Sequence, residues 1–392
     1  MKAMLLIAVL VSIVCSSDLT AQNASTAKGV FSLTPADKAI ARAGVLDNAN
    51  VDGVSIRTHW DALETADGTY NWTYVDGQVS RCVAAGKQIS LRVGTGSGDA
   101  TRGNGGTVPG WVIDQMVTAN GGTANDNTHF FHFNDASDGV PDRAIPTFWD
   151  RTFVSKKREM LTALGIHFAG NNNIKIVYVG FSNAQSMDWS VRDSKTVDGL
   201  GATGSSERSR WLALGYTAQK VIDAGCPASG TTGIIDAAAF AFPNATIVYA
   251  VGRNSAASNA PSMSGLDPTK DYVAQTVLNN AIAKYGNRIG IQKDNLSALT
   301  ASKQPYSGQP GANNFWTIIY NNPTRVGAQM VSSTYPDGGS KMNGGVFNPP
   351  SAAQILTTAV DAGIAYHTKY QEIYQIDVIN LPAVISYAHS KL

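Results

Sequence analysis

Residues 174–189, IKIVYVGFSNAQSMDW, change character in the middle of the stretch. The first half is an apolar run rich in β-branched residues, and Gly180 ends it. The second half is polar and contains two amides, a carboxylate and an indole. A buried run that opens abruptly into polar residues is typical of a parallel barrel strand where it meets its active-site loop. The stretch therefore predicts a barrel.

Similar apolar runs recur along the chain and alternate with helical patterns. The runs expected to form strands are 29–33, 53–60, 88–93, 174–180, 246–251, 288–292, 325–332 and 370–376. The stretches expected to form helices are 35–43, 74–85, 153–168, 205–224, 272–285, 352–363 and 381–392. Eight strands with mostly helical connections predict an α/β fold, a (β/α)8 TIM barrel in a single domain. The alternative is an open doubly wound sheet. The glycine-rich loop 94–98 lacks the helix start and the acidic residue that a nucleotide-binding sheet of that kind would show.

The N-terminus has the pattern of a secretory signal. Lys2 supplies a positive charge, residues 4–14 are apolar, and Leu19-Thr20-Ala21 is a plausible cleavage site. The apolar segment is too short to span a bilayer. We therefore expect a cleaved signal peptide over 1–21, a barrel domain over 22–392, and a secreted or periplasmic protein.

Composition narrows the range of partners. The chain has 392 residues, 15% of them charged, and a formal net charge of +1. A nearly neutral chain without a Lys/Arg block gives no electrostatic reason to expect nucleic acid or an anionic membrane as partner.

Beyond the signal peptide the chain contains two cysteines, Cys82 and Cys226, and their helical surroundings favour buried thiols over a disulfide. The six histidines show no metal-type spacing, so we expect no metal and no cofactor. The oligomeric state stays open.

Polar and aromatic residues gather at the C-terminal ends of the expected strands, where barrels of this kind build their sites. Amides and guanidinium groups hydrogen-bond hydroxyls, and indole faces stack on sugar rings, so the set suits an oligo- or polysaccharide. For each tryptophan, core packing is the alternative. The expected substrate-binding residues are Arg57, His59, Trp60, Arg92, Asn183, Gln185, Trp189, Gln329 and Tyr374.

One region resembles a known family. The residues concerned are Gly53-Val54-Ser55-Ile56-Arg57, Trp60, Leu63-Glu64, Gly68, Tyr70-Asn71-Trp72, Asp76, Ala84, Gly86-Lys87 and Leu91-Arg92. This pattern resembles the second-strand region of clan A glycoside hydrolases, the retaining (β/α)8 enzymes that include β-galactosidases and endoglycanases. Pro109-Gly110-Trp111 is similar to the P-x-W that follows strand three in that family, which implies Trp111 as a further sugar contact. The match covers roughly residues 53–112 and is loose beyond them.

The two catalytic glutamates of that family have no counterparts here. The family places an acid/base after an Asn at the end of strand four and a nucleophile at the end of strand seven. This chain has Asn183-Ala184 at the first position and Gln329 at the second, and neither Ala184 nor Gln329 can do that chemistry. The whole sequence contains four glutamates, Glu64, Glu159, Glu207 and Glu372, and only Glu372 lies on an expected strand. Glu64 belongs to the second-strand motif and is interpreted as a structural hydrogen-bonder. The family's usual pair of catalytic glutamates therefore cannot form in this chain.

Another carboxylate pair could take its place. Retaining hydrolysis needs carboxyl groups about 5–5.5 Å apart and inverting hydrolysis about 6.5–9.5 Å. The candidates are Asp188, Asp294 and Glu372; Asp on strands four and six resembles the pair of α-galactosidase-like barrels. For Glu372, lining the site and pairing with Arg92 or Arg57 as buried structure are both open. Two hypotheses follow: an exported glycoside hydrolase with a rearranged carboxylate pair, or a carbohydrate-binding pseudoenzyme with the same barrel.

Overall fold

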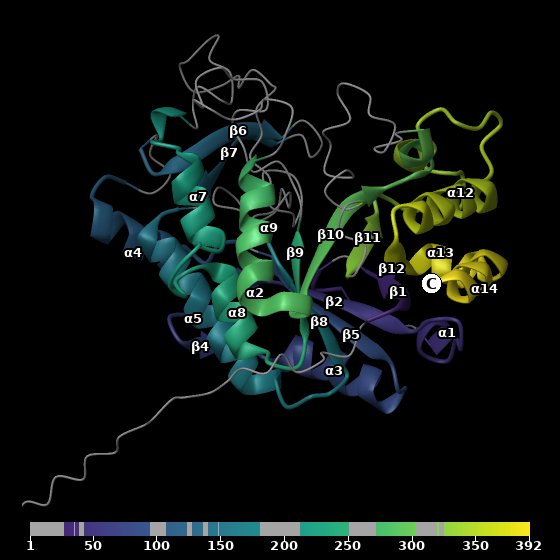
Figure 1. Ribbon diagram of the computed structural model, residues 1–392, viewed down its shortest axis with the longest axis horizontal. Coiled ribbons are helices and arrows are strands. Elements are labelled where there is room, and N and C mark those ends of the chain that lie inside the picture. Colours follow the sequence, from purple (N-terminus) through teal and green to yellow (C-terminus); the bar gives the residue numbers. More distant parts are fainter. Residues whose placement is uncertain are drawn as a thin grey trace, which may run out of the picture.

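Eight parallel strands close into a barrel in the spatial order β1-β12-β11-β10-β9-β8-β5-β2 (Figure 1). The computed structural model describes residues 27–34, 36–38, 43–94, 107–123, 128–135, 140–147, 149–180, 212–250, 272–302, 320 and 325–392. The barrel strands are β1 Gly29–Leu33, β2 Gly53–His59, β5 Gln88–Gly94, β8 Ile174–Val179, β9 Thr246–Ala250, β10 Ile289–Leu296, β11 Val326–Met330 and β12 Thr368–Tyr374. Every expected strand has its counterpart, and the predicted single-domain (β/α)8 TIM barrel is confirmed.

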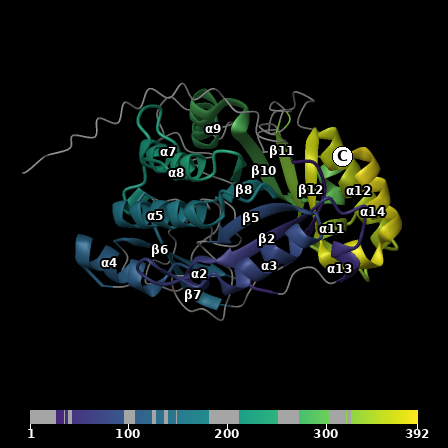
Figure 2. The ribbon, with the colours of Figure 1, turned by 90° about the horizontal axis from the view of Figure 1, so that it is seen from below.

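Helices surround the barrel, with α4, α5, α7, α8 and α9 on one side and α12, α13 and α14 on the other (Figures 1 and 2). Their bounds are α1 Ala43–Leu46, α2 Trp60–Leu63, α3 Thr73–Ala84, α4 Gly110–Asn120, α5 Arg151–Phe168, α7 Ala218–Gly225, α8 Ile234–Ala241, α9 Tyr272–Tyr285, α11 Ser340–Asn343, α12 Ala352–Ala365, α13 Gln375–Asn380 and α14 Pro382–Lys391. Short 3-10 turns lie at Gly286–Arg288 and Ala298–Ser302. Two antiparallel hairpins, β3 Glu64–Ala66 with β4 Thr69–Tyr70 and β6 Phe130–Asp135 with β7 Val140–Pro146, were not expected from the sequence.

Helix α5 illustrates how the sequence sets these elements. The Asp150 side chain accepts a hydrogen bond of 2.9 Å from the backbone N–H of Phe153, which caps the first turn. Along the helix, Phe153, Met160 and Leu164 are among the buried residues, spaced so that they fall on one face. The helix packs on α8, where Gly165 lies against Ala241 with no room for a side chain.

The apolar core has two parts. The larger part fills the space between the barrel strands and the helices. The smaller part lies inside the barrel and consists of Ala27, Phe31, Ile176, Tyr178, Val248 and Tyr370. A side chain at Gly53 or Gly327 would overlap the ring of Phe31 or Tyr370, respectively, so these glycines leave the volume that the rings fill. Above the apolar cluster the barrel interior becomes polar.

The two cysteines of the described residues are free thiols. Cys82 and Cys226 are both buried, which confirms the expectation of buried thiols. Among the described residues, no helix is long and apolar enough to cross a membrane.

Candidate functional site

Arg92 lies at the centre of the polar half of the barrel interior. Its Nη1 donates to Oδ2 of Asp294 at 2.8 Å and to Oε1 of Gln329 at 3.2 Å. Its Nη2 donates to Oε2 of Glu372 at 3.1 Å. One guanidinium therefore joins residues of β5, β10, β11 and β12. Arginine suits this position because its planar group presents several donors in fixed directions.

Gln292 links the same two carboxylates from a second direction. Its Nε2 lies 2.8 Å from Oδ1 of Asp294 and 3.0 Å from Oε2 of Glu372. Because one amide nitrogen contacts both groups, these two oxygens are less than about 6 Å apart, a spacing compatible with a hydrolytic carboxylate pair. The hydroxyl of Tyr370 donates to Oε1 of Gln292 at 2.6 Å, which fixes the orientation of the amide.

Two further groups complete the shell around the carboxylates. The hydroxyl of Tyr178 donates to Oδ2 of Asp294 at 2.8 Å, and Oγ of Ser90 donates to Oε1 of Glu372 at 3.3 Å. The guanidinium carbon of Arg92 also lies 3.4 Å from the centroid of the Tyr178 ring. The side chains of Asp294 and Glu372 are 2% and 0% exposed. Each carboxylate is thus buried, paired and hydrogen-bonded, as burial of a charge requires.

Arg57 adds a second positive charge beside this cluster. It is paired in register with Arg92, and its Nε and Nη2 donate to the carbonyl oxygen of Thr34 at 2.8 and 2.6 Å. Burial, and after it the positive charge of Arg92, lowers the pKa of the Arg57 guanidinium, while Tyr374, Glu372 and Asp294 act in the opposite direction. Burial also raises the pKa of the Tyr374 hydroxyl. The polar interior therefore holds two arginines against two carboxylates.

His59 forms a separate pair at the end of β2. Its Nδ1 lies 2.5 Å from Oδ2 of Asp37, and the other oxygen of Asp37 accepts a hydrogen bond of 2.7 Å from Oγ1 of Thr58. The carboxylate therefore orients the imidazole through one ring nitrogen. The sequence assigned His59 to sugar binding and did not anticipate Asp37.

The two described tryptophans of the expected sugar site, Trp60 and Trp111, pack against each other. Trp60 is completely buried, and its Nε1 donates to Oε2 of Glu64 at 2.7 Å. Trp111 is the second residue of α4. Its Nε1–H donates to the carbonyl oxygen of Glu64 at 3.2 Å, and its ring contacts Trp60 edge to face. Glu64 is therefore the structural hydrogen-bonder that the sequence indicated. Core packing, the alternative considered for each indole, describes Trp60.

A buried lysine lies at the C-terminal end of β8. Lys157 of α5 is buried, and its Nζ donates to the carbonyl oxygen of Gly180, directly after β8. Burial lowers the pKa of this ammonium well below its ordinary value. In the sequence, Gly180 is followed by the polar segment. Four expected site residues, Asn183, Gln185, Asp188 and Trp189, lie in that segment, outside the described residues.

The structure thus brings together Arg57, Arg92, Asp294, Gln329 and Glu372, with Tyr374 beside Arg57. It also adds Ser90, Tyr178, Gln292 and Tyr370, which the sequence-based set of site residues omitted. The alternation of side chains along a strand could have indicated such residues, because residues two apart point to the same face. Ser90 shares a face of its strand with Arg92, and Tyr370 shares one with Glu372. Among the residues that the structure describes, no three His, Cys, Asp or Glu side chains form a group that could hold a metal ion.

The fold and this polar interior define the class as a (β/α)8 barrel with its charged centre toward the C-terminal ends of the strands. No family model and no curated protein matches the sequence. Among solved structures, the catalytic domain of β-amylase from Paenibacillus polymyxa is similar, with a TM-score of 0.53 and 12% identity over 92% of this chain and 97% of that one. Xylanase 10B from Thermotoga petrophila, in complex with xylobiose, has a TM-score of 0.41 and 12% identity over 84% of this chain and 76% of that one. The chain resembles TIM-barrel glycoside hydrolases in fold, at low sequence identity.

Proposed function

We propose that this protein is an exported glycoside hydrolase that acts on an oligo- or polysaccharide at the C-terminal end of the barrel, with Asp294 and Glu372 as its carboxylate pair. The observation that carries the proposal is the contact of one Gln292 amide nitrogen with both carboxylates. This shared contact requires that Oδ1 of Asp294 and Oε2 of Glu372 lie less than about 6 Å apart. Such a separation suits the carboxylate spacing of a retaining enzyme.

The surrounding side chains support this assignment. Arg92 and Gln292 each contact both carboxylates, so the two groups are held in one fixed relative geometry. Preorganised groups of this kind are what a site needs to stabilise a charged transition state. Asp188, which follows β8 in sequence, stays a candidate for the acid in the same barrel.

A second function, carbohydrate binding without hydrolysis, is favoured by the burial of Glu372. Its side chain is 0% exposed and accepts hydrogen bonds from Ser90, Arg92 and Gln292. A nucleophile or proton donor must reach the scissile bond, and a fully enclosed carboxylate does so only if its partners move. Ala184 and Gln329, at the positions of the family's two glutamates, also favour a pseudoenzyme.

A measurement of substrate turnover distinguishes hydrolysis from carbohydrate binding without hydrolysis. The parent protein is incubated with a panel of α- and β-linked oligosaccharides, and products are identified by mass and anomeric configuration. Asp294→Asn and Glu372→Gln are compared with Asp114→Asn and Glu159→Gln, which change exposed carboxylates on α4 and α5. We expect the first two changes to lower turnover by about 10²–10⁴-fold and the controls to leave it intact.

Turnover that persists in both barrel variants would refute the assigned pair. Binding of a panel member without turnover in the parent would establish the binding function instead. Thermal unfolding of each variant distinguishes loss of chemistry from loss of fold. The proposed export is tested by N-terminal sequencing of the mature protein, which should begin at Gln22.

A further inference from the structure

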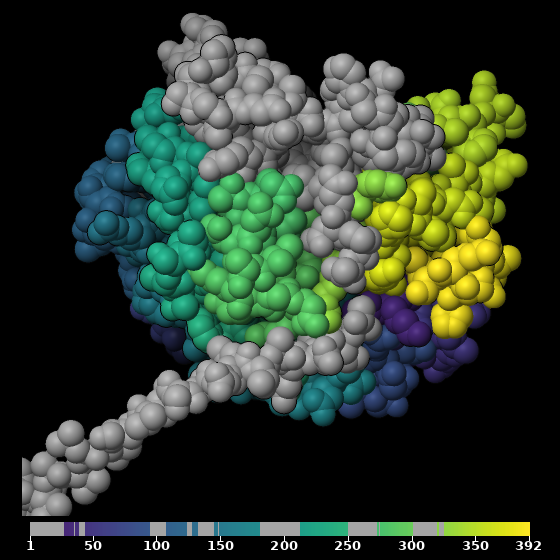
Figure 3. Space-filling view, viewed as in Figure 1, coloured from purple at the N-terminus to yellow at the C-terminus, as the bar shows by residue number. Residues whose placement is uncertain are grey.

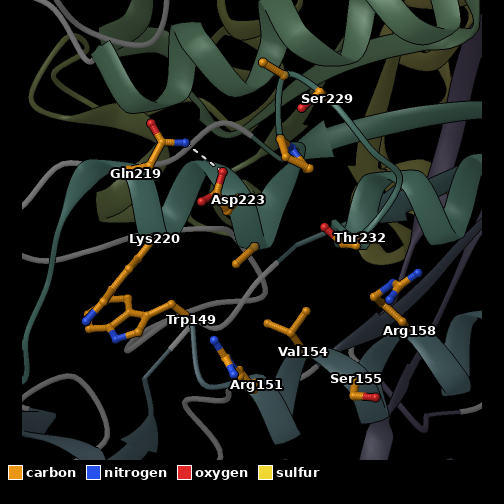
Figure 4. A pocket seen from close by; sticks show the side chains of 13 residues that line it. Trp149, Arg151, Val154, Ser155, Arg158, Gln219, Lys220, Asp223, Ser229 and Thr232 are labelled. Atoms are coloured by element: carbon orange, nitrogen blue, oxygen red, sulfur yellow. Dashed lines mark hydrogen bonds between the residues drawn. The ribbon is translucent and has the colours of Figure 1, made fainter.

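A groove lies on the outer flank of the barrel, between α5, α7 and the connection from α7 to α8 (Figure 4). Its volume is about 830 Å³, which is within the range of sites for small ligands. None of its lining residues belongs to the polar cluster inside the barrel. The groove is therefore a separate feature of the molecule.

Two helices supply the groove with polar side chains in a regular pattern. On α5, Arg151, Ser155 and Arg158 are spaced by four and three residues, so they lie along one face. On α7, Gln219 and Asp223 are spaced by four and face them across the groove (Figure 4). Nε2 of Gln219 donates to Oδ1 of Asp223 at 2.7 Å. Val154, Ala224 and Pro227 add an apolar lining.

The groove carries more positive than negative charge. Arg151, Arg158 and Lys220 line it together with one carboxylate, that of Asp223. One nitrogen of Arg158, Nη2, donates to the carbonyl oxygen of Thr231 at 3.0 Å. Its Nε is buried and has no hydrogen-bond partner in the described structure. The planar guanidinium groups of Arg151 and Arg158 are suited to bind an anionic group in the groove, because each presents several donors in fixed directions.

An indole stands at the side of the groove opposite Arg158 (Figure 4). Trp149 is half-buried, and a T-shaped contact of 5.6 Å with the Tyr216 ring holds it in place. A partly exposed indole offers an apolar surface suited to the CH face of a sugar ring. The hydroxyls of Ser155 and Thr232 and the amide of Gln219 suit sugar hydroxyls.

We propose that this groove is a second carbohydrate-binding site and that it takes an oligosaccharide bearing carboxylate groups, of the uronate type. The guanidinium groups of Arg151 and Arg158 bind the carboxylates, and Trp149 contacts a sugar ring. The choice of carbohydrate as ligand class rests on the proposed function of the barrel, whereas the acidic character rests on the charge of the groove itself.

The test is calorimetric titration with tetragalacturonate, and with xylotetraose as the neutral probe. The full chain is compared with Arg151→Gln, Arg158→Gln, the control Lys341→Gln on α11, and the barrel variant Glu372→Gln. We expect tetragalacturonate to bind the parent, Lys341→Gln and Glu372→Gln equally. Each groove variant should weaken binding by about 10- to 100-fold, the value of one charged hydrogen bond.

The possible results separate the groove from the barrel. The groove site is overturned if tetragalacturonate shows no saturable binding. It is also overturned if both groove variants bind tetragalacturonate as tightly as the parent does. Equal affinity for xylotetraose overturns its acidic specificity. Binding that is lost in Glu372→Gln and kept in the groove variants places the ligand in the barrel, which refutes the groove and supports the proposed function. If the groove binds tetragalacturonate but the protein turns over no substrate, the proposed hydrolase function is refuted and the groove site stands.

Discussion

Arg92 is the residue on which the barrel interior depends, because it is the donor that joins both buried carboxylates to a full positive charge. Its Nη1 and Nη2 point to Asp294 and Glu372, respectively, at 2.8 and 3.1 Å. A lysine has one compact charged group and could not span both carboxylates in this way. The ion pairs of both carboxylates therefore share a single side chain.

Replacing that side chain should be severe. Arg92→Met leaves Asp294 and Glu372 buried without their ion-pair partner, and we expect a loss of about 3–5 kcal/mol in the free energy of unfolding. The exposed Arg81 on α3 is the control, and Arg81→Met should cost less than about 1 kcal/mol. Urea unfolding at neutral pH measures both. A loss below 1 kcal/mol for Arg92→Met would mean that the carboxylates are neutral or otherwise compensated.

The two thiols give a prediction about pH. Burial raises the pKa of Cys82 to about 11 and, with the nearby Asp236 carboxylate as a second cause, raises the pKa of Cys226 to about 12. An unfolded thiol has a pKa of about 8.5, so between about pH 8.5 and 11 the unfolded chain loses protons that the folded chain keeps, and stability falls as pH rises. Mass-spectrometric mapping after iodoacetamide treatment at about pH 8 should find both thiols unlabelled in the native protein and labelled in urea. Rapid native labelling of either thiol would contradict its burial.

At the scale of elements, strands were easier to predict than the segments between them. The barrel strands are short apolar runs, and their alternation also indicates which side chains share a face. Helix α8, IIDAAAFA, was missed because it is buried nearly all round and so lacks a polar face. The β6–β7 hairpin was missed because β7, VPDRAIP, contains two prolines and an aspartate, which are uncommon in strands.

Two glycines test how tightly these elements are packed. Gly327 of β11 lies against the Tyr370 ring, so Gly327→Ala should overpack the barrel interior and cost about 1–3 kcal/mol. Gly77 lies inside α3 with open space around it, so Gly77→Ala should stabilise the protein by about 0.5–1 kcal/mol through helix propensity. Both are measured by urea unfolding. Equal effects at the two positions would show that local propensity outweighs packing in this barrel.

At the scale of the whole molecule, the site depends on contacts that no local pattern contains. Arg92 is 202 residues from Asp294 and 280 from Glu372 in the chain. The sequence identified each of these residues at a strand end, and closure of the barrel brings them together. It did not show that Trp60 would be enclosed by Glu64 and Trp111, because an aromatic residue at a strand end has the same local signal whether it packs or binds.

The C-terminal helix lies against the first strand of the barrel. Helix α14 packs on β1, and Figure 3 shows the C-terminal residues beside N-terminal ones on the surface. Val384, Ile385 and Ala388 are its buried residues. Nδ1 of His389 lies 2.9 Å from Oδ2 of Asp52, which also accepts a hydrogen bond of 2.8 Å from the N–H of Val30. The helix thus covers the strand that follows the N-terminus.

Removing residues 382–392 should therefore open the barrel where its first and last strands meet. The deletion removes the buried side chains of Val384 and Ile385, whose burial alone contributes about 3–6 kcal/mol, a large part of the 5–15 kcal/mol typical of a folded domain. We expect the shortened chain to unfold at a much lower urea concentration, with loss of the near-ultraviolet circular dichroism of the barrel aromatics. His389→Gln is the control: its side chain is 39% exposed, and breaking its contact with Asp52 should cost less than about 1 kcal/mol. An unchanged midpoint in the shortened chain would show that β1 and β12 hold the barrel closed by their own pairing, without the helix that covers them.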